Sequence, residues 1–378
     1  MSIQWDTAFP GGNGLLLDKD ERARRPVLRF AAEPKNCPQA LWFHFRLSGL
    51  DGPVRVVLAN PEQTLGGWNW SADRPVWREP RGPWRRLGTP EKLVAPGGRV
   101  EWGWDIDTRA AGAEVAFCYP YQPADLAATL AELGGAFQQT HIGLSYANRQ
   151  LPRVFSALPD PARPGVYITA RHHAGETPGS WVLEGLLRHV AATSALRDGL
   201  VWWAAPFVDL DDVVEGSYGK DPYPHDCNRA YGTAGPRRPE GAAIEADVHC
   251  FKDGCKSIFF LDLHAPGHAE QTVYVPLRGW DLDAPINPMA QPFAEMFNLR
   301  QDQELRSPQA HFTPAAGANS RYAGLSSGRW AAEILKVDAV TVETSYQGNG
   351  RVYYDINDYR RLGAILAETV AEWMRRRG

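Results

Sequence analysis

The 378-residue sequence is notable first for what it has little of: cysteine, long apolar runs and blocks of one charge. Its five cysteines are odd in number and scattered, which argues against a disulfide framework and a CxxC zinc site. No stretch of about 18 apolar residues occurs, so we expect no membrane-spanning helix. The opening "MSIQWDTAFPGGNG" lacks the basic and apolar regions of a secretory signal. Together these absences predict a cytoplasmic protein without a membrane partner.

Charge and composition further limit the kinds of protein that the sequence can encode. The formal net charge is −4, and charges of both signs are mixed along the chain. Without a basic block, we expect no nucleic-acid partner. Hydrophobic residues make up 44% of the chain, which is enough for a sizeable core. The length predicts two domains or one large domain.

The first third of the chain predicts a β-sandwich. Eight of the fourteen tryptophans lie in residues 1–104. Short runs rich in β-branched and aromatic residues are bounded by Gly, Pro and Asn, as in "ALWFHFRLSG" and "PVRVVLAN". In "WNW" and "WGW", alternation puts Trp68 with Trp70, and Trp102 with Trp104, on one strand face, which favours a core. We therefore predict an N-terminal antiparallel β-sandwich domain over residues 1–122. A module that stacks exposed aromatics on sugars or bases is the alternative.

From residue 123 the pattern changes to alternating helices and strands. Such alternation predicts an α/β domain over residues 123–378, with a mixed central sheet flanked by helices. The segment "PADLAATLAELGGAF" has apolar residues at helical spacing, as does the C-terminal "DYRRLGAILAETVAEWMRRR". Near-continuous apolar runs predict strands buried on both faces. The strands expected on this basis are 199–208, 257–264 and 338–344, and 165–170 is a further strand candidate.

Chemically active residues follow three of these predicted strands. In open α/β sheets, sites form at the carboxyl ends of strands. A catalytic zinc needs three protein ligands and an open position for water. His173 and Glu176 have the His-x-x-Glu spacing that supplies two ligands, and His264 is a third. Neighbouring residues on a strand point to opposite faces, so His172 is expected to point away. Glu343 is a spare carboxylate that can take a proton from bound water.

Four segments, taken in order, resemble the zinc metallocarboxypeptidase family, and more narrowly its cytosolic carboxypeptidase-like branch. They are "ARHHAGETPGSWVLEGLL", "HDCNRAY", "FLDLHAPGH" and "VTVETSYQGN". Ala174 stands where that branch usually has proline. A fifth segment, "FCYPYQPADL", resembles the junction between the branch's N-terminal β-sandwich and its peptidase domain.

The resemblance implies a role for each matching residue. It implies one Zn²⁺ per chain, with the ligands His173, Glu176 and His264. Glu343 is expected to act as general base on zinc-activated water and to pass the proton to the leaving amine. Asn228 and Arg229 are expected to bind the terminal carboxylate, which an arginine fork holds through two hydrogen bonds. The expected function is hydrolysis of the C-terminal peptide bond, with peptide or protein C-termini as partners.

The sequence departs from the family where the oxyanion is stabilised. Gly219 stands in place of the usual arginine, and the adjacent Lys220 offers only a point charge. Tyr322 is a substrate-side candidate from its spacing to the catalytic strand. Arg329 lies in "SSGRWAAEIL", before that strand, and suggests a preference for acidic C-terminal residues. The alternative is that Arg329 faces solvent or pairs with Glu333 on a helix.

Two other functions stay open. Zinc deacylases of the aspartoacylase and succinylglutamate desuccinylase type share the His-x-x-Glu and distant His ligands. The N-terminal sandwich and the Asn228-Arg229 pair favour the peptidase. A metal-binding protein without catalysis is the third possibility, given Gly219, but the retained Glu343 argues against it.

Overall fold

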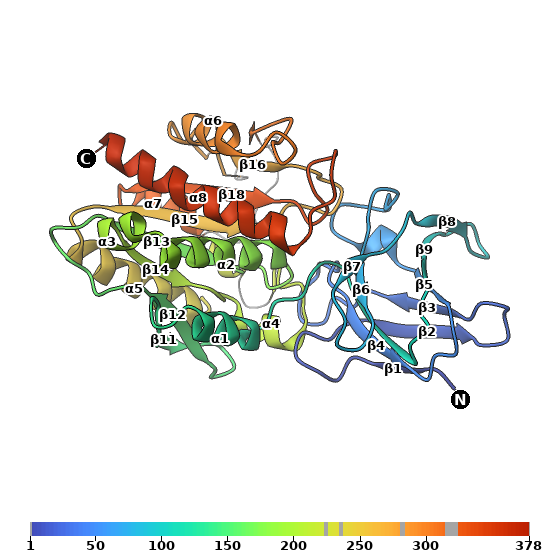
Figure 1. Ribbon diagram of the computed structural model, residues 1–378. Coiled ribbons are helices and arrows are strands. Elements are labelled where there is room, and N and C mark those ends of the chain that lie inside the picture. The colour runs from blue at the N-terminus through green and yellow to red at the C-terminus, as the bar shows by residue number, and fades with distance from the viewer. Residues whose placement is uncertain (1, 223–225, 234–236, 280–283, 314–323, 378) are drawn as a thin grey trace.

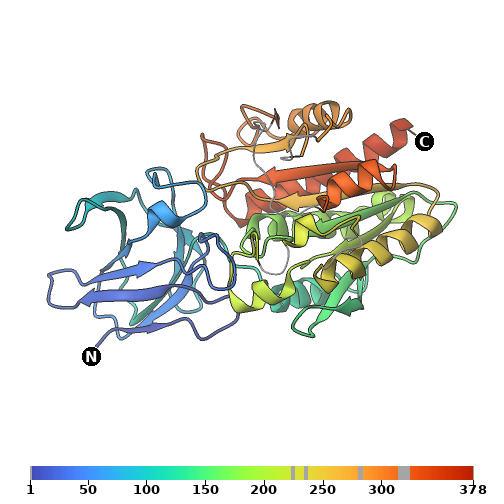
Figure 2. The ribbon, with the colours of Figure 1, turned by 180° about the vertical axis from the view of Figure 1, so that it is seen from behind.

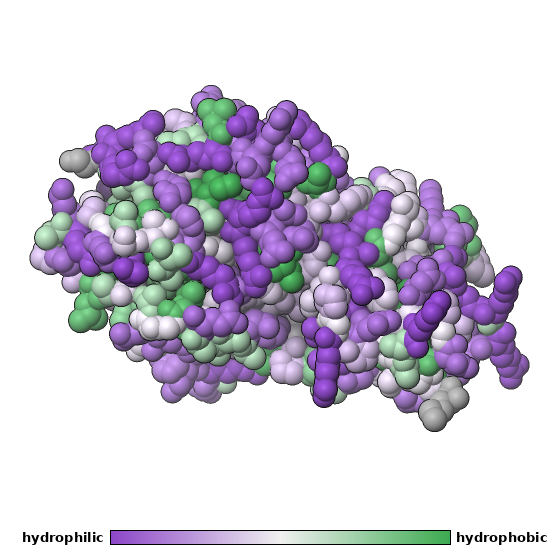
Figure 3. All heavy atoms as spheres, viewed as in Figure 1, coloured by the Kyte–Doolittle hydropathy of each residue, from purple (hydrophilic) through white to green (hydrophobic). Residues whose placement is uncertain are grey.

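The computed structural model describes residues 2–222, 226–233, 237–279, 284–313 and 324–377 (Figure 1). These form two lobes that lie side by side in both views (Figures 1 and 2). Hydrophilic residues cover much of the face seen in Figure 3. One lobe is built from β-strands and spans residues 4–116, and we call it the all-β lobe. The other, the α/β lobe, begins with helix α1 at Pro123. A domain boundary at residue 122 stays a prediction.

The all-β lobe contains two five-stranded sheets. The first has the order β1(Gln4–Asp6), β4(His44–Ser48), β10(Gly112–Ala116), β6(Val76–Arg78), β7(Arg85–Arg86). The second has the order β2(Leu15–Asp20), β3(Val27–Ala31), β5(Val54–Leu58), β9(Val100–Ile106), β8(Glu91–Val94). The pairs within both sheets are antiparallel except β3 with β5, which run parallel. A short 3₁₀ helix, η1 (Pro61–Gln63), follows β5.

Aromatic side chains fill the core of this lobe. Trp102 and Trp104 on β9 are buried, as the alternation predicted. The same expectation is wrong for the other pair, because Trp70 is fully buried whereas Trp68 is 49% exposed. Both lie in irregular chain between η1 and β6, where the two-residue period of a strand does not apply. Trp70 packs edge-to-face against Trp104, with ring centroids 6.0 Å apart.

The α/β lobe is organised around an eight-stranded mixed sheet, which confirms the predicted fold class. Its four central strands are parallel, in the order β14, β13, β15, β18. Antiparallel pairs flank them on both sides. The strands are β11(Gln138–Leu144), β12(Gln150–Phe155), β13(Gly165–Ala170), β14(Val201–Ala205), β15(Ile258–His264), β16(Val273–Pro276), β17(His311–Phe312) and β18(Asp338–Thr344).

Helices cover both faces of this sheet. α2 and α8 lie in front of it in Figure 1, and α5 and α7 lie in front in the reverse view (Figure 2). α2 and α8 pack closely at Gly363, because this residue has no side chain. A Cβ there would lie 2.0 Å from the Val182 carbonyl oxygen. The helices are α1(Pro123–Glu132), α2(Thr177–Ala192), α3(Ser194–Gly199), α4(Leu210–Glu215), η2(Cys227–Arg229), α5(Pro239–Gly254), α6(Ala290–Arg300), α7(Ser327–Glu333) and α8(Ile356–Arg377).

Two further features bear on the expectations from composition. Within the described ranges, no helix combines the length and apolar character needed to cross a membrane. All five cysteines are free thiols, and only Cys250 among them is exposed.

Candidate active site

The parallel strands bring the predicted site residues to one edge of the sheet. β13 ends at Ala170 and leads into the turn that carries His173 and Glu176. β15 ends at His264, which is the register partner of Glu343 on β18. Because β13, β15 and β18 are adjacent and parallel, their carboxyl ends meet at this edge. The four side chains are all buried.

Two histidines face one carboxylate in this cluster. His173 Nδ1 lies 2.6 Å from Glu176 Oε1, and His264 Nδ1 lies 2.7 Å from Glu176 Oε2. The ligand atoms of these residues all lie within 4.8 Å of one another. Burial opposes ionisation of Glu176, but the two imidazoles outweigh it and lower the pKa of its carboxyl. Two imidazole nitrogens and a carboxylate oxygen form a ligand set of catalytic zinc.

Each of these histidines also presents its second ring nitrogen to a buried aspartate. His173 Nε2 lies 3.3 Å from Asp226 Oδ2, and His264 Nε2 lies 3.0 Å from Asp262 Oδ2. Metal-ligating histidines almost always pair their other nitrogen with a carboxylate, carbonyl or water, which fixes the ring orientation. The surroundings of the cluster therefore fit a metal held through the two Nδ1 atoms and Glu176.

His172 lies beside His264, in irregular chain after the end of β13, where the two-residue period of a strand does not apply. Its ring stacks on that of His264, with centroids 5.4 Å apart and planes 9° apart. His172 Nδ1 lies 2.9 Å from Asp262 Oδ1, and Nε2 lies 2.7 Å from the Tyr231 hydroxyl. His172 thus contributes to the packing behind the cluster, where it shares Asp262 with His264.

Asp262 connects these groups, and sequence reasoning missed it. Besides the two histidines, it accepts hydrogen bonds from Thr169 Oγ1 at 2.7 Å and from Ser327 Oγ. It precedes His264 by two residues on β15, so both side chains point to the same face. The Asp-x-His spacing within a buried strand was the available signal.

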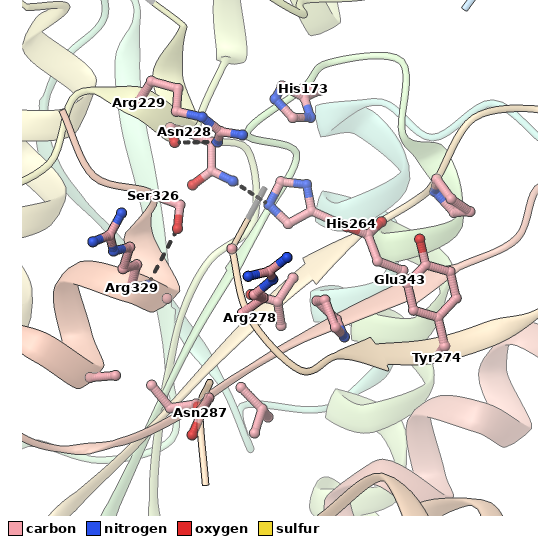
Figure 4. Close-up of a pocket in the computed structure, with 18 of the residues that line it drawn as sticks. His173, Asn228, Arg229, His264, Tyr274, Arg278, Asn287, Ser326, Arg329 and Glu343 are labelled. Atoms are coloured by element: carbon pink, nitrogen blue, oxygen red, sulfur yellow. Dashed lines mark hydrogen bonds between the residues drawn. The ribbon is translucent and has the colours of Figure 1, made fainter. Parts of the chain in front are cut away.

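Glu343 stands beside the cluster (Figure 4). Its Oε2 atom has no hydrogen-bond partner among the described residues. Burial raises the pKa of Glu343 to about 7, against the lowering effect of His264. A buried carboxyl with a pKa near neutrality suits a group that takes up and releases protons at pH 7.

Asn228 and Arg229 lie on η2, next to His264 (Figure 4). Asp226 begins this short helix, because its Oδ1 accepts a hydrogen bond from the Asn228 backbone N–H at 2.7 Å. Asn228 Nδ2 lies 3.0 Å from His264 Nε2, and Asn228 Oδ1 accepts from the Ser327 backbone N–H at 2.9 Å. Asn228 and Arg229 line the same pocket as the cluster.

The Gly219 position admits no side chain in this backbone. Its φ is +78°, and a Cβ there would lie 2.6 Å from the Ala174 backbone nitrogen and 3.0 Å from Asp209 Oδ2. The arginine of the family therefore cannot be accommodated at this point without a backbone change. Lys220, the next residue, lines the pocket together with Glu343.

The pocket has a volume of about 590 Å³, and Arg329 also lines it. The Arg329 Nε donates to Glu333 Oε1 at 2.6 Å, four residues on in α7, so the predicted alternative pairing is present. The other candidate, Tyr322, falls outside the described residues.

Residues of β16 and the segments around it complete the pocket and were not predicted. Tyr274 is the register partner of Glu343 across the antiparallel pair, and its hydroxyl donates to Glu270 Oε2 at 2.9 Å. Arg278 also lines the pocket. Figure 4 shows Arg278 between His264 and Asn287. No local pattern in the sequence signals that β16 returns alongside β18.

The chain is similar to metallocarboxypeptidases in sequence and in fold. No protein-family model matches the chain. Cytosolic carboxypeptidase 6 of Homo sapiens is 27% identical over 289 residues, covering 69% of this chain and 56% of that protein. The Mus musculus protein of the same name is 25% identical over 291 residues, covering 70% and 53%. The chain thus spans about half the length of the curated relatives it matches.

Solved structures show the same fold over the whole chain. A metallo-carboxypeptidase from Burkholderia cenocepacia superposes with a TM-score of 0.80 at 19% identity, covering 100% of both chains. One from Pseudomonas aeruginosa, in complex with (2-guanidinoethylmercapto)succinic acid, gives 0.79 at 18% identity, covering 98% of this chain and 99% of that one. These findings confirm the resemblance to the zinc metallocarboxypeptidases and to their cytosolic branch.

Proposed function

We propose that the protein is a zinc-dependent carboxypeptidase that hydrolyses the C-terminal peptide bond of peptides or proteins. The observation that carries the proposal is the convergence of His173, Glu176 and His264 beside Glu343, whose buried Oε2 has no partner among the described residues. Asn228 and Arg229 open into the same pocket, which gives it a site for a terminal carboxylate. The named relatives and structural neighbours are carboxypeptidases, which favours this activity over a deacylase.

His173, Glu176 and His264 would hold one Zn²⁺, which supplies a lowered water pKa and polarises the scissile carbonyl when bound. Glu343 takes the proton from the attacking water and delivers it to the leaving amine. Its raised pKa suits both halves of that transfer. Asn228 and Arg229 bind the terminal carboxylate of the substrate and so orient the last residue.

Lys220 supplies positive charge for the developing oxyanion in this proposal. Gly219 leaves no room for a side chain, and Lys220 is the adjacent cation that lines the pocket. An ammonium acts as a point charge and does not bind in a planar fork, so its placement is less exacting than that of arginine.

We further propose a preference for acidic C-terminal residues. Arg278, Arg329 and Lys336 line the pocket beyond the Asn228-Arg229 pair. Arg329 is partly compensated by Glu333, whereas its guanidinium still borders the cavity. A carboxylate side chain that enters this space lies near these three cationic side chains, with Glu333 as a neighbouring anion. The cytoplasmic location expected from the sequence stays a prediction.

The test combines metal analysis with release of C-terminal residues from peptides ending in Glu, Asp, Lys, Phe and Ala. We expect one zinc per chain and fastest release of Glu. Glu343→Gln should keep zinc and abolish release. Glu240→Gln, a buried carboxylate beside Arg238, is the matched control and should retain activity. Turnover of N-acyl amino acids without peptide cleavage would establish the deacylase instead.

A further inference from the structure

The all-β lobe contributes directly to the pocket. Leu65 and Gly66, in the segment between η1 and β6, line it from that lobe. On the facing side, Ala265, Pro266 and Gly267 follow directly after the proposed zinc ligand His264 and line the same pocket. The pocket is therefore lined by both lobes. We call the part that the all-β lobe supplies, Leu65 and Gly66, the wall, and it faces the residues that follow directly after His264.

The wall segment is anchored within its own lobe. The Leu65 backbone N–H donates to the Ala40 carbonyl oxygen at 2.9 Å. The buried Thr64 hydroxyl accepts a hydrogen bond from Trp70 Nε1 at 3.1 Å. The Leu65 side chain is half-buried, so part of its apolar surface stays available to a ligand in the pocket.

His268 fastens this segment to the α/β lobe. Its Nδ1 lies 2.9 Å from Asp73 Oδ2, and its Nε2 lies 2.8 Å from the Gly67 carbonyl oxygen. Its ring stacks on Trp70, with centroids 4.4 Å apart and planes 26° apart. His268 is buried and follows His264 by four residues. The end of β15 thus carries a proposed zinc ligand, and the short loop after it carries the contact that positions the wall.

Gly66 allows this close approach. Its φ is +106°, and a Cβ there would lie 2.5 Å from His268 Cδ2 and 3.0 Å from the His268 backbone nitrogen. No other residue fits at this separation, so the distance between the wall and the loop after His264 is fixed by the absence of a side chain.

The direction of a bound peptide follows from the proposed function, on which this inference rests. Asn228, Arg229 and Arg329 lie to one side of His264, with Glu343 and Tyr274 to the other (Figure 4). Helix α7, which carries Arg329, lies away from the all-β lobe in the reverse view (Figure 2). A C-terminal residue held by Asn228 and Arg229 therefore points its preceding chain away from α7 and toward the wall.

We propose that Leu65 and Gly66 form the binding surface for the penultimate residue of the substrate, with His268 as the positioning residue. Leu65 and Pro266 give this surface an apolar character, so the residue it accepts is apolar. The all-β lobe then selects substrates by the residue on the N-terminal side of the scissile bond. The ligand is the C-terminal dipeptide unit of an extended chain.

The test uses two acetylated tripeptides that share the same C-terminal residue and differ only in a penultimate Leu or Gly. The zinc-loaded wild-type protein should favour the Leu peptide in kcat/KM. Leu65→Ser should lower kcat/KM for the Leu peptide about tenfold and leave the Gly peptide within twofold. Leu17→Ser, which changes a 51% exposed leucine on β2 of the same lobe that does not line the pocket, is the control and should keep the wild-type ratio.

His268→Gln separates positioning from folding, because a merely structural role would not change the ratio between the two peptides. We expect that ratio to fall while zinc content stays at one per chain. Binding of both peptides, with a fluorescent label in place of the acetyl group, to zinc-loaded Glu343→Gln repeats the comparison without turnover and is measured by fluorescence anisotropy. Wild type that cleaves neither peptide overturns the proposed function, whereas an unchanged ratio of Kd or kcat/KM in Leu65→Ser overturns the binding surface.

Discussion

Replacing Asp262 by Asn tests whether the buried carboxylate behind the cluster controls metal binding. Asp262 faces His172 and His264 and accepts from Thr169 and Ser327. An asparagine of the same shape carries no charge and replaces one acceptor oxygen by an NH₂ group. One side of the network then meets a donor where it had an acceptor. Both His264 and His172 lose their anionic partner, and one of the two faces the NH₂ group.

The expected size of the effect follows from that geometry. Removing the carboxylate partner of a metal-bound histidine typically lowers metal affinity about 10- to 100-fold. That range corresponds to about 1.4–2.7 kcal/mol at 25 °C. We expect Asp262→Asn near the upper end, because Asp262 is fully buried and water cannot replace it.

The assay is competition for zinc with a chelating indicator at fixed pH, together with thermal unfolding of the metal-free protein. Asp247→Asn is the matched control. Asp247 is also buried, accepts from Tyr167 at 2.8 Å and from Arg153, and lies on α5 outside the cluster. It should lower the unfolding temperature without changing zinc affinity. Asp262→Asn that folds and binds zinc within twofold of wild type would refute the reasoning, and so would an equal loss of zinc affinity in Asp247→Asn.

Three other predictions concern single residues. Lys220→Ala should lower kcat on the order of 100-fold with a smaller change in KM. Assays of the C-terminal residue released at fixed reaction times would measure both constants. Burial opposes ionisation of Glu114, but hydrogen bonds from His44 and Arg78 lower the pKa of its carboxyl to about 2. The folded protein therefore gains stability from Glu114 above about pH 4.5 and loses up to ~3 kcal/mol of it as the pH falls toward 2. Denaturant titrations at several pH values should show this slope in wild type and a flatter one in Glu114→Gln. Gly363→Ala should lower the free energy of unfolding by more than ~2 kcal/mol in the same titration, because its methyl group would strike the Val182 carbonyl.

The residues that sequence reasoning brought together are those at the ends of parallel strands. His173, Glu176, His264 and Glu343 follow apolar runs, and parallel neighbours end at one edge, so local pattern and topology were enough to group them. The role of each stays a proposal until it is tested.

The missed residues have a common physical origin. Tyr274 joins the site through an antiparallel return of β16 onto β18, and Leu65 joins it through contact between lobes. Neither contact leaves a periodic signal in the local sequence, because both depend on pairing over long separations. The Trp68 and Trp70 prediction failed for a related reason, since the period of a strand was applied to irregular chain.

Because α2 packs closely against α8, the last helix also supports residues that it does not contact directly. α2 begins directly after Glu176, and α8 covers its apolar face. A protein truncated before Ile356 would expose that face of α2 to water. The turn that carries His173 and Glu176 would then precede a helix that has lost its packing partner. Loss of zinc from such a truncated protein would then report collapse of a scaffold, although no residue of α8 is among the proposed ligands. Tags or fusions that strain this helix are best avoided when metal content is measured.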